Sequence, residues 1–221
     1  MKSNGSRPPL ARRMFLSQMG VAAAVAVPSA VAQSTTPPPA NGRFEPTRHM
    51  LDDWLDQVPS QHRCVFDTTT PDGVKSAAQF AGNFFMVNKN TYNVENNEIA
   101  LVIVVRHNST PFGYNDSIWA KYGAPISQQS GFLDPKTSMP PTANLYRTNL
   151  ESLIKQGARL AVCQLATRAY AGTIARATGG QTNAIFDELA ANLLSNSQLV
   201  PAGIVAVNRA QEHGYTFVHA V

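Results

Sequence analysis

The sequence predicts an α/β protein: a single domain with an open, mostly parallel five-stranded sheet and helices on both faces, in three layers. Two observations predict this class. Short apolar segments of strand length alternate along the chain with longer segments that have helical periodicity. One short segment, residues 99–105, is a continuous apolar and mostly β-branched run, which is typical of a strand buried on both faces of a parallel sheet.

The first half of the folded region is expected to hold two strands and three helices. Pro71 is a favourable first residue for a helix, and apolar residues recur at helical spacing after it. In chain order, the expected elements are a short helix over 49–58, a strand over 63–68, a helix from 71, the strand over 99–105 and a short helix over 116–122.

The second half begins with a break over 123–141, which is rich in glycine and proline and is expected to be a long loop. Glycines after the periodic segments that follow mark the ends of helices. In chain order, the expected elements are an amphipathic helix over 142–156, a strand over 158–162 followed by Cys163, helices over 164–178 and 184–194, a strand over 199–201, a helix over 202–213 and a strand over 215–218.

The N-terminus has the pattern of a twin-arginine export signal over residues 1–32. The pair Arg12-Arg13 precedes an uncharged stretch over 20–27, and a small-residue cleavage pattern ends at Ala32. A disordered or anchored N-terminus is the alternative, although the stretch is too short for a stable membrane span. We therefore expect a periplasmic protein that meets the membrane only during export, with a flexible Pro-rich linker over 33–46 and a folded domain over 47–221.

Charge argues against a nucleic-acid-binding protein, and cysteine content argues against a disulfide-rich domain. The chain has 18 basic and 14 acidic residues, but four of the basic residues lie in the predicted signal, which leaves the mature chain neutral. A neutral chain without basic clusters argues against a nucleic-acid partner. Two cysteines, Cys64 and Cys163, fall short of a disulfide framework, and they can bridge only if their two strands are neighbours.

Cys163 is the candidate reactive residue, because it ends a predicted strand and directly precedes a predicted helix. The carboxyl ends of parallel strands are where α/β proteins place functional groups, and a helix N-terminus stabilises a thiolate. The alternative is a structural cysteine in the core, since cysteine is among the most buried residues and Ala161 and Val162 flank it.

Three segments around this cysteine carry a family resemblance: residues 156–163, 200–205 and 211–215. They read Gln-Gly-Ala-Arg-Leu-Ala-Val-Cys, Val-Pro-Ala-Gly-Ile-Val and Gln-Glu-His-Gly-Tyr. Their order and spacing resemble the DsrE/DsrF-like family of small α/β proteins linked to sulfur transfer. The resemblance covers about residues 60–221 in topology and 156–217 in motif.

The resemblance implies a flavodoxin/Rossmann-like three-layer sandwich that assembles into homo-oligomers, trimers or hexamers. It also implies that Cys163 carries a persulfide, as the matching cysteine does in the sulfur-relay members. The cytosolic relay proteins work in a reducing compartment, whereas this chain has an export pattern. A possible sulfurtransferase or persulfide carrier with a sulfur donor or acceptor as partner is the function that the resemblance favours.

A second candidate site follows the strand over 99–105, in the segment 106–119. Because both strands are expected to be parallel, this segment and Cys163 are expected at the same edge of the sheet. The segment combines a cation, an imidazole, amides and aromatic rings, which together can line a ligand pocket. The expected ligand-binding residues are Arg106, His107, Asn115, Asp116 and Trp119. The alternatives are a helix cap at Asn115 or Asp116 and a subunit contact made by the aromatic side chains.

The sequence has no motif typical of a metal site, a nucleotide site or a serine hydrolase. The five histidines show no metal-ligand spacing, and no glycine-rich phosphate loop or dinucleotide fingerprint is present, so no metal and no cofactor are expected. A nucleophile-elbow hydrolase is disfavoured because the G-x-S-x-G motif is absent. Three functions compete, in this order: sulfur or thiol-redox chemistry at Cys163, a non-catalytic ligand-binding module built on the segment 106–119, and a structural oligomer without chemistry.

Overall fold

The computed structural model describes residues 44–221, and Pro46–Val221 form one compact unit. The predicted signal over 1–32 and most of the predicted linker over 33–46 lie outside the described residues. Within the described part of the chain, no helix is both long enough and apolar enough to cross a membrane.

Five strands form one open sheet in which every pairing is parallel, so the predicted fold class is confirmed. The spatial order is β4-β3-β2-β1-β5. The central strand is the continuous apolar run of the sequence, and all seven of its residues are buried. The strands are β1 (His62–Thr68), β2 (Ile99–Val105), β3 (Arg159–Cys163), β4 (Ser197–Val200) and β5 (Thr216–Ala220).

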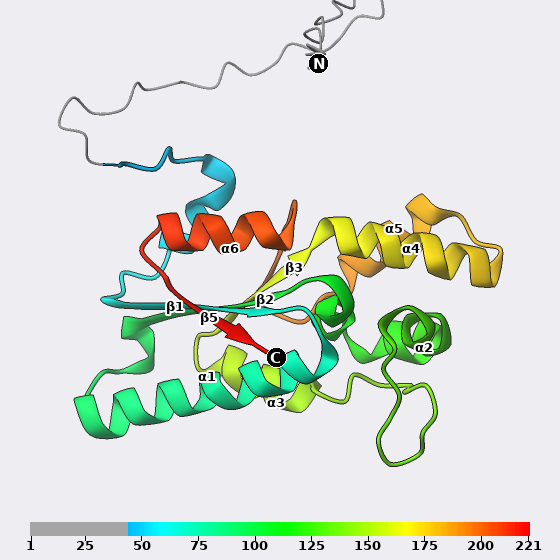
Figure 1. Ribbon diagram of the computed structural model, residues 1–221, viewed down its shortest axis with the longest axis horizontal. Helices are drawn as coiled ribbons and strands as arrows, with labels where there is room; N and C mark the ends of the chain where they lie inside the picture. Colours follow the sequence, from blue (N-terminus) through cyan, green and yellow to red (C-terminus); the bar gives the residue numbers. More distant parts are fainter. Residues whose placement is uncertain (1–43) are drawn as a thin grey trace, which may run out of the picture. The chain divides into compact units, whose positions relative to one another are not determined.

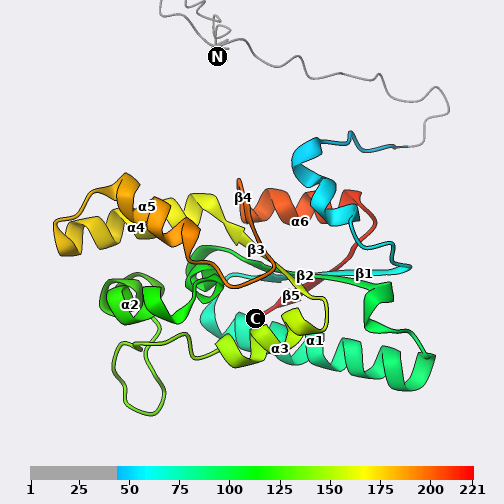
Figure 2. The ribbon, with the colours of Figure 1, turned by 180° about the vertical axis from the view of Figure 1, so that it is seen from behind.

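Helices cover both faces of this sheet, as Figures 1 and 2 show. One face carries α6 and the 3-10 helix η1, and the other carries α1 and α3. The helical elements are η1 (Met50–Asp56), α1 (Pro71–Tyr92), η2 (Asn96–Glu98), η3 (His107–Gly113), α2 (Asp116–Ser130), α3 (Arg147–Lys155), α4 (Gln164–Thr178), α5 (Thr182–Ala191) and α6 (Gly203–Glu212).

Side-chain alternation along the strands divides the apolar interior into two cores. In β2, Leu101 and Ile103 lie in the core on the α1 side, whereas Val102 and Val104 lie in the core on the α6 side. Both sets are almost completely buried, and burial of that extent is the main stabilising contribution to such a sheet. A strand that is apolar at every position therefore needs helices on both faces.

The helices α2, α4 and α5 lie beyond the carboxyl ends of the strands (Figures 1 and 2). α4 continues from the end of β3 and packs against α5 and α2. The fully buried side chains of Tyr170 and Ile174 anchor α4 in the core on the α1 side. This helical group forms one wall of the region where the strands end.

The predicted long break over 123–141 is wrong in its first part, because α2 continues to Ser130 and only 131–141 form a loop. The helix is kinked at Tyr122, whose backbone is non-helical with φ −127° and ψ 17°. Pro125 is tolerated because it lies in the first turn after the kink, where a missing N–H and the proline ring do least harm. A Cβ on Gly123 would lie 2.1 Å from the carbonyl oxygen of Pro141, so glycine allows the following segment to pass close to the kink.

The helix expected over 142–156 begins only at Arg147. The reason is Asn144, whose side chain is buried and folds back instead of continuing a helix. Its Nδ2 donates to the carbonyl oxygens of Phe112 and Tyr114 at 2.8 and 2.9 Å. This segment is therefore held to η3 by side-chain hydrogen bonds.

The two cysteines do not meet. Cys64 lies in β1 and Cys163 at the end of β3, and β2 separates those strands. Both thiols are free, since the condition of neighbouring strands is not fulfilled. Cys64 is buried, and burial raises the pKa of its thiol, although a hydrogen bond with Thr216 lowers it in part.

Asp56 ties η1 to the amino-terminal side of the sheet. Its carboxylate accepts from Arg63 at 2.6 Å and lies 2.8 Å from Nδ1 of the buried His213. Burial raises the pKa of Asp56, but the hydrogen bonds with Arg63 and His213 outweigh that effect and hold the pKa below its ordinary value.

Candidate functional site

The carboxyl ends of β2 and β3 bring two of the predicted residues side by side. Val105 pairs with Val162, so the next residues, Arg106 and Cys163, lie opposite one another. Arg106 keeps an extended backbone, and Val104, two residues earlier, is buried in the core on the α6 side. By alternation, the Arg106 and Cys163 side chains both project to the α6 side.

The Arg106 guanidinium is engaged by a carboxylate of the same chain. Its Nε and Nη2 donate to the two oxygens of Asp67 at 2.7 and 2.8 Å, and Nδ1 of His219 lies 3.5 Å from the same carboxylate. The Asp67 side chain is 4% exposed. The hydrogen bonds that Arg106 donates to Asp67 raise the pKa of Arg106, with a smaller contribution from the nearby Cys163. Asp67 therefore occupies one edge of the guanidinium and balances its charge, and the expectation that Arg106 holds an external anion stays a prediction.

A glycine at the start of α6 makes room for this arginine. A Cβ on Gly203 would lie 2.5 Å from Cβ of Arg106 and 3.0 Å from its Cδ. No side chain larger than hydrogen fits between them without movement. The glycine of the segment 200–205 is therefore explained by the close approach of the Arg106 stem to the first turn of α6.

His107 takes an unusual backbone conformation directly after Arg106. Its φ is +57°, in the left-handed region that non-glycine residues enter rarely. The hydroxyl of Ser109 stabilises this turn: it accepts from the Arg106 N–H at 2.9 Å and lies 2.8 Å from the Thr68 carbonyl oxygen. Nδ1 of His107 lies 2.8 Å from Oδ1 of Asn108, and this contact orients the ring.

His107 and Cys163 line one surface pocket of about 570 Å³. The thiol is the N-cap of α4: Sγ accepts from the Ala166 N–H at 3.5 Å, and the residue is 6% exposed. The pocket combines a thiol at a helix N-terminus, an oriented imidazole and apolar walls. Its lining residues are His107, Asn108, Gln129, Cys163, Leu165, Ala166 and Ala169. This arrangement places a thiol and an imidazole around one open binding space.

Gln129, which no sequence pattern indicated, lines the pocket from the last turn of α2. Its Oε1 is buried and has no hydrogen-bond partner within the described residues. It falls in the segment that the sequence predicts to be a loop. The signal for the longer helix was the four-residue spacing of Ile118, Tyr122 and Ile126, all of which are buried.

Asn115 and Asp116 do not reach the pocket lining and act at the start of α2. Oδ1 of Asn115 accepts from the Ser117 N–H at 3.0 Å and caps the helix. Asp116 accepts from the Asn144 N–H at 3.0 Å and pairs with Arg147 at 3.2 Å. The alternative of a helix cap therefore describes Asn115, whereas Asp116 holds the segment around Asn144 and the start of α3 to α2.

Trp119 belongs to the core and has no exposed surface. Its Nε1 donates to the carbonyl oxygen of Pro111 at 3.0 Å, and its ring lies 5.3 Å from that of Phe112. A buried indole with a satisfied N–H contributes to packing rather than to an open pocket. Of the five residues expected to bind a ligand, only His107 lines the thiol pocket.

Within residues 44–221, no three His, Cys, Asp or Glu side chains are grouped closely enough to hold a metal ion. The fold and the site together define an open parallel α/β protein with a thiol pocket at the carboxyl edge of its sheet.

No protein-family model and no curated protein matches the chain. Among solved structures, the chain is similar to the protein of unknown function MTH1491 from Methanobacterium thermoautotrophicum, with 16% sequence identity and a TM-score of 0.41. The match covers 72% of this chain and 99% of the other.

Proposed function

We propose that this chain is an exported DsrE/DsrF-like protein that handles sulfane sulfur or thiol redox chemistry through Cys163. One observation carries the proposal: the Cys163 thiol caps α4 and opens into a pocket that it shares with the oriented imidazole of His107. A thiolate is the nucleophile in sulfur transfer, and an imidazole can take the proton that the thiol loses.

The transfer needs one donor, a persulfide R–S–SH. His107 accepts the thiol proton, and the Cys163 thiolate attacks the terminal sulfur of the donor. A new S–S bond forms on Cys163, the S–S bond of the donor breaks, and R–S⁻ leaves with the electron pair. The imidazolium returns the proton to R–S⁻, so that no external oxidant or reductant is required.

The test is native-state labelling of the protein with a thiol reagent across a range of pH, read by intact mass, with and without a sulfane-sulfur donor. We expect rapid labelling at Cys163 and a gain of one sulfur atom there. Cys64 is the internal control, because its burial predicts that it stays silent until unfolding. If the Cys163 thiol stays silent in the folded protein, the proposed chemistry is wrong. Asn108→Ala is expected to slow labelling, because it removes the group that orients His107.

A non-catalytic small-ligand module at the same pocket is the second candidate. The composition of the pocket favours it: an open space of about 570 Å³ is lined by apolar side chains and by the polar groups of His107, Asn108 and Gln129, which can orient a small ligand. For this function Cys163→Ser leaves ligand affinity unchanged, whereas it abolishes sulfur transfer. The proposal also includes trimers or hexamers, which light scattering tests; a monomer would contradict that part.

Export by the twin-arginine route is proposed from Arg12-Arg13 and the segment that follows. The test is fractionation of cells that express the chain and the double variant Arg12→Lys/Arg13→Lys. We expect the chain in the periplasm and the double variant in the cytoplasm. Equal distribution of both proteins would contradict export by this route.

A further inference from the structure

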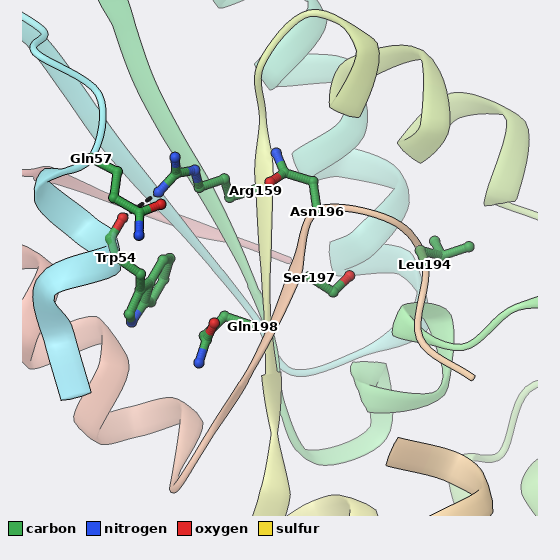
Figure 3. A pocket seen from close by; sticks show the side chains of 7 residues that line it. All are labelled: Trp54, Gln57, Arg159, Leu194, Asn196, Ser197 and Gln198. Atoms are coloured by element: carbon green, nitrogen blue, oxygen red, sulfur yellow. Dashed lines mark hydrogen bonds between the residues drawn. The ribbon is translucent and has the colours of Figure 1, made fainter. Parts of the chain in front are cut away.

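A second pocket lies at the other end of the sheet, beside η1 and the amino-terminal parts of β3 and β4 (Figure 3). Its volume is about 200 Å³. Arg159 begins β3 and Cys163 ends it, so the two sites are about 13 Å apart along the strand. The lining residues are Trp54, Gln57, Arg159, Leu194, Asn196, Ser197 and Gln198, and none of them lines the thiol pocket.

The guanidinium of Arg159 has no carboxylate partner within the described residues, although it is half-buried. Its Nη1 donates to the carbonyl oxygen of Trp54, which holds the side chain across the pocket toward η1 (Figure 3). Among residues 44–221, the other half-buried arginines are each paired with a carboxylate at 3.5 Å or less: Arg63, Arg106 and Arg209. Arg159 therefore offers a fixed, partly desolvated positive charge that the described chain does not neutralise.

The polar groups around Arg159 are neutral. Gln57 and Gln198 supply amides, Ser197 supplies a hydroxyl, and no Asp, Glu or second cation lines the pocket. Figure 3 shows Arg159 and Gln198 extending from β3 and β4 to the side on which the ring of Trp54 lies. The indole provides an apolar wall beside the guanidinium.

We infer that this pocket binds a small monocarboxylate. The Arg159 guanidinium binds the carboxylate through its remaining N–H donors, because planar guanidinium and carboxylate groups match in geometry. A single cation balances a single negative charge, whereas a dianion would leave one charge uncompensated. The neutral amides of Gln57 and Gln198 bind polar substituents, and the ligand body lies against Trp54. This site is independent of the function proposed for Cys163.

The experiment is a calorimetric titration of the full chain with propionate, lactate and benzoate, each compared with propionamide. Propionamide has the shape of propionate without its charge, so it separates recognition of the anion from packing. We expect saturable binding of a monocarboxylate at one site per chain and none of propionamide. Binding is expected to weaken by at least about tenfold in Arg159→Gln, which loses a charge-assisted contact.

Two further variants keep this test decisive. Gln198 is exposed, so Gln198→Glu is expected to fold normally while it places a negative charge in the pocket and abolishes binding. Arg176→Gln is the matched control, because Arg176 is exposed on α4 and its removal is expected to leave affinity unchanged. The inference is overturned if no monocarboxylate saturates the chain, if Gln198→Glu binds like the unaltered protein, or if phosphate or sulfate binds more tightly.

Discussion

Replacement of Asp67 by asparagine tests the ion pair that organises the carboxyl edge of the sheet. The substitution keeps the size of the side chain and removes its charge. Arg106 then loses the acceptor of two short charge-assisted hydrogen bonds, at 2.7 and 2.8 Å, and His219 loses its carboxylate neighbour. A half-buried guanidinium without a counter-charge remains in the folded state.

The expected loss of stability follows from the burial of the two charged side chains. Removal of one partner from a fully buried ion pair costs about 3–5 kcal/mol. The Arg106 side chain is 23% exposed, so water compensates part of this cost, and we expect Asp67→Asn to lower the free energy of unfolding by about 2–3 kcal/mol. For a domain of this size that corresponds to a decrease in Tm of about 5–10 °C.

Urea unfolding followed by circular dichroism measures the change directly. The double variant Asp67→Asn/Arg106→Gln is expected to recover part of the loss, because it removes the uncompensated charge. Glu151→Gln is the control: it removes an exposed pair with Arg147 at 3.9 Å and is expected to change stability by less than about 0.5 kcal/mol. If Asp67→Asn is as mild as this control, the pair does not stabilise the edge of the sheet.

Three further outcomes are expected. Gly203→Ala pushes a Cβ against Arg106 and destabilises the fold by about 1–3 kcal/mol in urea unfolding, whereas Gly82→Ala, whose Cβ meets nothing within 4 Å, is neutral or stabilising; equal effects would contradict the steric account. Because the pKa of Asp56 is lowered in the folded state, its contribution to stability is present above about pH 4 and is lost as the pH falls through the folded pKa. Asp56→Asn should therefore flatten the acid side of the stability profile, and an unchanged profile would refute this. Asn144→Ala leaves two carbonyl oxygens without their donor and is expected to cost about 2 kcal/mol by thermal unfolding, while retention of full stability would show that water replaces the amide.

Local patterns predicted the strands well, because strand identity depends on neighbouring residues in the chain. The run over 99–105 is β2 residue for residue, and the segment expected over 63–68 lies within β1. The same kind of pattern failed over 123–130, where α2 continues, although 131–141 form the expected loop. Gly123 and Pro125 are residues typical of loops, so local patterns predict a loop there. The helix nevertheless restarts after the kink at Tyr122, and burial of Ile126 stabilises it.

The candidate site was predictable only in part. The place of Cys163 at a strand end followed from the chain itself, and parallel strands brought the start of segment 106–119 to the same edge. The ion pair between Arg106 and Asp67 could not be predicted from the sequence. Asp67 lies 39 residues earlier in the chain and contacts Arg106 only because β1 pairs with β2. Trp119 lies in a segment whose composition is typical of a ligand site, but the hydrophobic effect places its indole in the core.

By itself, the sequence determined the class of fold and the position of one thiol at the end of a strand. Both depend on periodicity and on chain order, which are local properties. The tertiary structure alone decided two features around that thiol: Gln129 lines its pocket, and Arg106 is already engaged by Asp67. It also left Arg159 without a carboxylate within the described residues, at the opposite end of β3. Such pairings arise from strand order and helix packing between segments far apart in the chain, and no local pattern encodes them.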